Sequence, residues 1–423
     1  MTATIRELTQ HFTDLWWESD INLPDLGPSY TSNEQAVREK QLEHFLKQVN
    51  SEIANPPRDR EGMQALQNRL GVSFRQFAQE TLGITAQHFA VLPSDDFSAA
   101  AQDFIQKARA FDPNLSGEDI YQAGRNAWTA NGLQWLLGVP VECSPSIFAY
   151  SMLYPYTDNY LDDASISIST KLAFNERFRQ RLMGERIAPE NDHERIIFNL
   201  VGMIEQQYAR FSYPGVFESL LDIHTGQAKS LRLERPNAAP GEVNVLGISI
   251  EKGGTSVMTD GYLVSGTLGP AQRMFSFGHG VFAQLLDDLE DVRQDYAAGR
   301  LTVYSQAAGH WSLDTLTNRT FHFGRKVLER LDCFEIAEPV KDLIGRGATS
   351  ILIDTASRAE RFYTPAYLRE LETHSPFRFS FLNKQRKDFA RRNGSVVKLI
   401  ETFVPHNLDD QSLLLGELLP GVR

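Results

Sequence analysis

Apolar residues recur along most of the chain at the spacing of helices rather than of strands. Three early stretches, at 32–53, 62–81 and 97–111, carry this pattern, and Asn-Pro-Pro at 55–57 closes the first of them. From residue 119 onward the pattern predicts long, mostly apolar helices. The only β-like runs, at 243–250 and 301–304, are too few to build a sheet. Because an ordinary chain has about a fifth of its residues in strands, this scarcity predicts an all-α fold.

The helical pattern is interrupted at 112–118 (DPNLSGE), which suggests a boundary. Ser116 is the expected N-cap of a helix over 119–137. We expect residues 1–114 to form an extra N-terminal helical region packed on the core, and residues 115–423 to form the main α-bundle. Trp16 and Trp17 are expected to pack onto that core, with a membrane-surface anchor as the alternative.

One predicted helix is apolar along its length and acidic where it ends. Ser144 followed by Pro145 is a good helix start, and the sequence that follows, PSIFAYSMLYPYTDNYLDDAS, is apolar until it reaches Asp158, Asp162 and Asp163. Pro155 is expected to kink this helix one turn before the acids and to help aim them.

A second segment, FAQLLDDLEDVRQD at 282–295, makes the same abrupt change. Residues four apart share a helix face, so Asp287, Asp291 and Asp295 should form one stripe, with Asp288 turned about 100° aside. Like charges at this spacing repel, and a divalent cation would compensate them. All-oxygen ligands suit Mg²⁺, with Mn²⁺ as a substitute. A solvated acidic face is the alternative, but the apolar GHGVFAQLL before it favours a buried helix that ends at a cavity.

Two helices of this kind, facing each other in a bundle, would place metal ions at the mouth of an apolar pocket. Such a site suits a substrate with a diphosphate head and a hydrocarbon tail, because the metal ions neutralise the leaving group while the dry pocket receives the tail.

These segments resemble the class I isoprenoid synthases. The run from Phe282 is similar to the second aspartate-rich motif of trans-polyprenyl diphosphate synthases (FQxxDDxxD, with one residue inserted) and to the NDxxSxxxE metal motif of terpene cyclases. The earlier acids resemble the first aspartate-rich motif, in the DxxxDD spacing of squalene and phytoene synthases. Further similarities are a Gly-Gln pair at 226–227, a lysine-threonine motif at 251–255, a Gly-Arg pair at 299–300, and an arginine and tyrosine at 361 and 363.

The resemblance covers roughly residues 119–363 and implies a class I isoprenoid synthase helical bundle that binds Mg²⁺. It implies that the metal ligands are Asp158, Asp162, Asp163, Asp287, Asp288, Asp291 and Asp295. Among these, the residues expected to be catalytic are Asp158, Asp162, Asp287 and Asp291. The residues expected to contact diphosphate or substrate are Gln227, Lys252, Arg300 and Arg361. Arg293 is expected to pair with Glu290 or to be a surface charge, and Gly253-Gly254 to permit either a helix break or close helix packing.

Departures from the family pattern narrow the reaction. Chain-elongating relatives hold a second diphosphate with a GGKR-like segment and an arginine pair after the first acidic motif, and neither occurs here. Without such cations a second diphosphate would be poorly bound. The expectation is a class I terpene synthase, a lyase that ionises one prenyl diphosphate, here a C20 diterpene precursor that is linear or already cyclised. The alternatives are a prenyltransferase, either chain-elongating or of the squalene/phytoene type, and an inactive bundle that serves as a regulatory partner or isoprenoid carrier.

Composition restricts partners and location. The formal net charge of -12 over 423 residues argues against nucleic acid as a partner. The two cysteines, Cys143 and Cys333, fit neither a disulfide framework nor a thiolate zinc site. No stretch approaches the roughly 20 apolar residues of a membrane span, and the N-terminal residues do not resemble a secretion signal. These features favour a soluble cytoplasmic enzyme with a small-molecule substrate, and they leave a homodimer open.

Overall fold

The computed structural model describes residues 3–54, 57, 59–92, 94–163, 165–234 and 241–392. Within these ranges the regular elements are all helical and no strand occurs, so the predicted all-α class is confirmed. Among the described residues, no helix is both long and apolar enough to cross a membrane.

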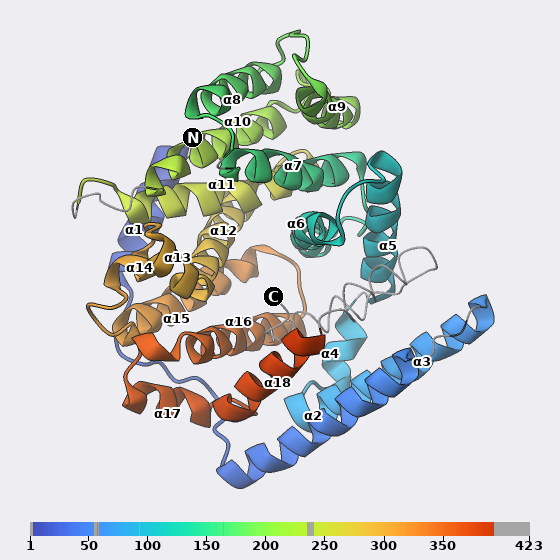
Figure 1. Ribbon diagram of the computed structural model, residues 1–423, viewed down its shortest axis with the longest axis vertical. Coiled ribbons are helices and arrows are strands. Elements are labelled where there is room, and N and C mark those ends of the chain that lie inside the picture. Colours follow the sequence, from blue (N-terminus) through green and yellow to red (C-terminus); the bar gives the residue numbers. More distant parts are fainter. Residues whose placement is uncertain are drawn as a thin grey trace.

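Five helices form the centre of the molecule. They are α6 (Gly117–Leu136), α7 (Pro145–Asp162), α10 (Pro214–Ser230), α11 (Val245–Ser265) and α12 (Pro270–Glu290). Helix α11 packs against each of the other four, and most of its residues are buried (Figure 1). It is therefore the helix around which the central group is built.

The starts of α6 and α7 lie where their capping residues predict. The Ser116 hydroxyl accepts a hydrogen bond from the Asp119 amide at 3.0 Å, and the Ser144 hydroxyl accepts one from the Ile147 amide at 3.4 Å. Each bond satisfies an amide that has no partner within the first turn of the helix. Pro155 lies inside α7, as expected.

Glycines let α11 and α12 approach each other closely. A Cβ added at Gly253 would lie 2.4 Å from the Gln284 Cβ and 2.6 Å from the Gly280 carbonyl oxygen. Helix α11 runs without interruption through this point. Of the two roles predicted for Gly253-Gly254, close packing is the one observed.

The N-terminal helices pack on different parts of the molecule. Helix α1 (Ile5–Glu18) lies against α11, α12 and α15 (Asp314–Leu328), and Phe12 and Trp16 are completely buried there. The predicted packing of Trp16 onto the core is confirmed, whereas Trp17 is 58% exposed. Helices α2 (Ser32–Ile53) and α3 (Arg60–Phe77) lie against each other, α4 (Ala86–Val91) lies against α16 (Glu338–Arg358), and α5 (Ser94–Phe111) lies against α6 (Figure 1).

The remaining helices surround the centre. On one side, α8 (Ile168–Leu182) and α9 (Asp192–Gln207) pack with α7 and α10 around one hydrophobic core. On the other, α12, α15 and α16 enclose a second core together with α1. The other helices are α13 (Val292–Ala298), α14 (Val303–Ala307), α17 (Pro365–Thr373) and α18 (Phe379–Arg392), which is the last helix of the described residues.

Candidate active site

The later acidic segment forms an almost continuous helical stripe. Helix α12 ends at Glu290 and α13 begins at Val292, so Asp291 lies at a junction that the sequence did not predict. The helical hydrogen bonds nevertheless continue through it: the Asp291 amide donates to the Asp287 carbonyl and the Asp295 amide to the Asp291 carbonyl, both at 2.9 Å. The four-residue spacing of the three acids is therefore kept.

The carboxylates of this stripe influence one another. Burial raises the pKa of Asp295 to about 6, and the charges of Asp291 and Asp287 add to the increase while Arg300 opposes it. Burial likewise raises the pKa of Asp288 to about 7, with a further contribution from Asp287. The carboxyl groups of this stripe thus lie close together where water cannot fully screen their charges.

Asp288 is held between α11 and α12. Its Oδ1 accepts a hydrogen bond from the Gln284 side-chain amide at 2.8 Å, and the ammonium of Lys252 on α11 lowers its pKa. Its other oxygen, Oδ2, is buried without a hydrogen-bond partner among the described residues.

The earlier acidic segment lies at the C-terminal end of α7. The Asp158 Oδ1 accepts a hydrogen bond from the Gln227 side-chain amide of α10 at 3.0 Å, so these two predicted site residues meet. Asp163 is exposed, and its hydrogen bonds with Ser165 lower its pKa. Asp162 is the last residue of α7, and its side chain lies outside the described residues.

A chain of contacts joins the two acidic segments. Next to Gln227, Gly226 packs so closely on α11 that an added Cβ would lie 3.2 Å from the Lys252 Cα. Lys252 in turn acts on Asp288 of α12. Asp158, Gln227 and Asp288 are all close to the C-terminal ends of their helices, so α7, α10 and α12 present these ends at the same side of α11.

Helix α6 contacts both acidic segments and so provides a second connection between them. Its Asp119 accepts a hydrogen bond from Asn159, the neighbour of Asp158, at 3.1 Å. Its Arg125 lies 3.9 Å from the Asp287 Oδ1. Asp119 and Arg125 are six positions apart, which is a rise of about 9 Å along a helix axis. Both acidic segments therefore lie at one end of the central helices.

Two charged residues beside the acids were not predicted from the sequence. Arg125 reaches Asp287 from α6, and Glu234, which follows α10, lies 2.7 Å from Arg300. The predicted residue Arg300 is also 4.0 Å from the Asp295 Oδ1. No spacing along the chain marks Arg125 or Glu234, because each meets its partner only through helix packing.

Other predicted residues have different surroundings. The guanidinium of Arg361 is exposed and stacks over the rings of Phe362, at 4.4 Å, and Tyr296, at 5.8 Å. The predicted Arg293–Glu290 pair is not formed: Arg293 donates a hydrogen bond to the Arg358 carbonyl at 3.4 Å, and the Arg358 guanidinium pairs with Glu290 at 2.5 Å. Arg293 is exposed, which agrees with the alternative of a surface charge.

The donor chemistry suits Mg²⁺, since the clustered side chains offer carboxylate oxygens and one of them, Asp288 Oδ2, is buried without a partner. Among the described residues, however, no three His, Cys, Asp or Glu side chains are arranged to hold a metal ion.

Comparison with known proteins returned no match, whether with protein-family models, curated proteins or solved structures. The chain's own residues therefore carry the functional assignment.

Proposed function

We propose that this protein has the class I isoprenoid synthase fold and is a Mg²⁺-dependent terpene synthase. Its substrate is a prenyl diphosphate, which we take to be C20 and either linear or already cyclised. The observation that supports this most directly is the chain of contacts through Gln227, Gly226 and Lys252 that links the two acidic segments at one end of α7, α10 and α12.

In this proposal Mg²⁺ neutralises the diphosphate and makes it a better leaving group. Asp158, Asp162, Asp287, Asp291 and Asp295 would hold the ions, with Asp163 and Asp288 ligating them or orienting the ligands. Lys252, Arg125 and Arg300 supply cations for the diphosphate oxygens. Departure of a leaving group without nucleophilic help depends on such electrostatic stabilisation. Gln227 orients Asp158 through their hydrogen bond.

The basic residues after the first acidic segment favour a reaction with one diphosphate. Arg177 of α8 is 2.8 Å from Glu194 and 3.2 Å from Glu190, and Arg181 pairs with Glu205. These arginines are already neutralised by glutamates. A second diphosphate would have to compete with those ion pairs, which supports a terpene synthase over a prenyltransferase.

The test is incubation with Mg²⁺ and geranylgeranyl diphosphate alone. The expected result is release of diphosphate together with a monomeric hydrocarbon or alcohol, and loss of both when EDTA removes the metal. If product forms only after isopentenyl diphosphate is added, the protein is a chain-elongating prenyltransferase and the proposal is wrong.

Variants connect the activity with the acidic segments. Asp158→Asn and Asp287→Asn should each lower diphosphate release by about 100-fold or more, because each removes a charge that the metal ions need. Asp192→Asn is the matched control, since the Asp192 side chain is 89% exposed and its ion pair among the described residues is with Arg195 on its own helix. Unchanged turnover in both site variants would exclude these aspartates as metal ligands.

A further inference from the structure

A second polar group lies deeper between the central helices. Asp260 of α11 is 1% exposed, and neither its position nor its partner belongs to the acidic segments described above. Its Oδ1 accepts a hydrogen bond from the Asn126 side-chain amide of α6 at 3.1 Å. Its Oδ2 is buried and has no hydrogen-bond partner among the described residues. An oxygen in this position is costly unless it meets a ligand or carries a proton.

Residues spaced four apart on α7 and on α11 show where Asp260 lies relative to the candidate active site. Lys252, Ser256 and Asp260 occupy one face of α11, and Tyr150, Tyr154 and Asp158 occupy one face of α7. The hydroxyls of Tyr154 and Ser256 are 2.7 Å apart, which fixes the two faces against each other. Asp158 and Lys252 therefore lie at the end of the helices that carries the acidic segments. Asp260 lies about 12 Å further along α11, toward the C-terminus of that helix.

The hydrogen bonds also indicate which oxygen of Asp260 would carry a proton. The Asn126 amide nitrogen donates to the Ser151 hydroxyl and to the Asp260 Oδ1, both at 3.1 Å. Oδ1 is thus an acceptor, so the proton of a neutral carboxyl is on Oδ2. Burial raises the pKa of Asp260 well above its usual value, and the single amide bond of Asn126 opposes this only in part.

We infer that Asp260 is the acid of a second, proton-initiated step, in which its Oδ2–H protonates a neutral polyene that forms when the first carbocation loses a proton to the released diphosphate. This inference rests on the proposed function. In the step, the O–H bond breaks, a C–H bond forms at one carbon of a double bond, and a carboxylate faces the new carbocation. The carboxylate then removes a proton from a neighbouring carbon, which forms a new double bond and restores the acid. A buried carboxylate stabilises an adjacent carbocation more strongly than an exposed one would.

The test uses solvent deuterium. The protein is incubated with Mg²⁺ and geranylgeranyl diphosphate in D₂O, and the product mass is compared with the product formed in H₂O. The carboxyl proton exchanges with solvent between turnovers, whereas the proton taken back comes from the substrate. The expected product of the wild-type protein therefore carries one deuterium on carbon.

Variants assign the label to Asp260. Asp260→Asn keeps the shape of the side chain but lacks the acid, and should lower deuterium in the product per diphosphate released by at least tenfold. Asp260→Glu should restore part of the label. Asp222→Asn is the control, because Asp222 is a partly buried carboxyl on α10 outside this group, and its label should equal that of the wild type.

The outcomes separate the two proposals. Release of diphosphate with no deuterium in the wild-type product overturns the inference and leaves the proposed function intact, and this reading does not depend on any variant folding. A label that persists in Asp260→Asn also overturns it. Absence of diphosphate release overturns the proposed function, and with it the reaction in which Asp260 would act.

Discussion

At the scale of single residues, burial without a cationic partner controls the protonation of Asp260. An unfolded aspartate has a pKa of about 3.9, whereas burial raises the pKa of Asp260 well above this in the folded protein. Above pH 4 the folded state then holds a proton that the unfolded state has lost. The contribution of Asp260 to stability is therefore complete below pH 4 and falls as pH rises toward the folded-state pKa.

Asp260→Asn should remove this loss, because the amide stays neutral. The free energy of unfolding of the variant, relative to wild type, should rise by up to about 1.4 kcal/mol per pH unit above pH 5, until the folded-state pKa is reached. Urea unfolding at pH 5, 6, 7 and 8 measures it, with Asp192→Asn as an exposed control. A difference that does not grow with pH would show that Asp260 is ionised in the folded protein.

Sequence patterns predict how residues close together in the chain are placed relative to one another. The stripe at Asp287, Asp291 and Asp295 was predictable because a four-residue spacing alone places side chains on one helix face. The contacts of Asp260 were not, since its partner Asn126 is 134 residues away. Arg125 was missed for the same reason, as it meets Asp287 only after α6 and α12 have both packed against α11.

At the scale of elements, the glycines of α11 set its distance from α12. Gly253→Ala would place a Cβ 2.4 Å from the Gln284 Cβ and 2.6 Å from a backbone oxygen of Gly280, which cannot rotate away. The helices would have to separate, and we expect the free energy of unfolding to fall by about 1–3 kcal/mol in urea unfolding.

Gly345→Ala on α16 provides the comparison. Apart from its chain neighbours and the backbone of its own helix, no atom of the described residues lies within 4 Å of the Cβ that it would add. Since alanine is also the better helix former, this change should stabilise the protein by up to about 1 kcal/mol. Equal effects of the two substitutions would rule out close packing as the role of Gly253.

Capping chemistry made two of the central helices predictable, because a cap is read from adjacent residues. Ser116 and Ser144 cap α6 and α7 as expected. The junction at Asp291 was not foreseen, since the apolar and acidic pattern continues through it and nothing in the sequence there is a helix stop.

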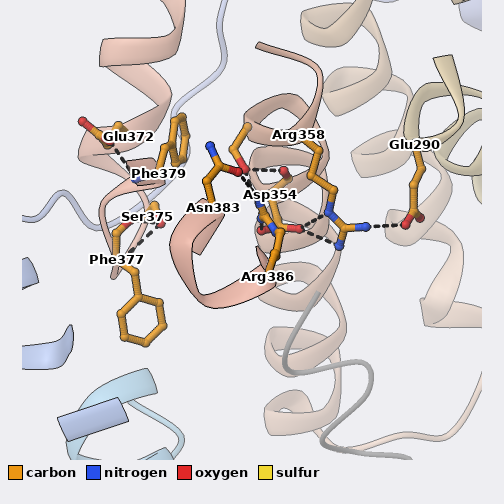
Figure 2. A network of polar contacts seen from close by, with 10 residues as sticks. Glu290, Asp354, Arg358, Glu372, Ser375, Phe377, Phe379, Asn383 and Arg386 are labelled. Atoms are coloured by element: carbon orange, nitrogen blue, oxygen red, sulfur yellow. Dashed lines mark hydrogen bonds and ion pairs between the residues drawn. The ribbon is translucent and has the colours of Figure 1, made fainter. Parts of the chain in front are cut away.

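At the scale of the whole molecule, sequence patterns did not show which helices would be neighbours. The pattern predicted N-terminal helices at 32–53, 62–81 and 97–111 but did not single out α1 or α4. Their packing partners, α11 and α12 for α1 and α16 for α4, depend on matching apolar faces far apart in the chain. The same holds for α18, whose polar residues reach an ion network in the interior (Figure 2).

That network connects α18 with the acidic end of α12. Asp354 of α16 is 5% exposed and pairs with both Arg386 of α18 and Arg358, and Arg358 continues to Glu290 at 2.5 Å (Figure 2). Glu290 lies between the site residues Asp287 and Asp291. The network thus holds the end of α12 that carries the acids.

Removing Asp354 should be costly because two guanidinium groups would lose their shared partner inside the protein. We expect Asp354→Ala to lower the free energy of unfolding by about 3–5 kcal/mol. Asp192→Ala, which breaks an exposed pair with Arg195, should lower the free energy of unfolding by less than about 1 kcal/mol.

Urea unfolding of both variants, of Arg386→Leu, and of Asp354→Ala combined with Arg386→Leu measures the coupling energy between Asp354 and Arg386. Because the double variant leaves fewer buried charges unpaired, it should be about 1–3 kcal/mol more stable than the sum of the single effects predicts. Strict additivity would mean that α18 is not held to the bundle through this ion pair.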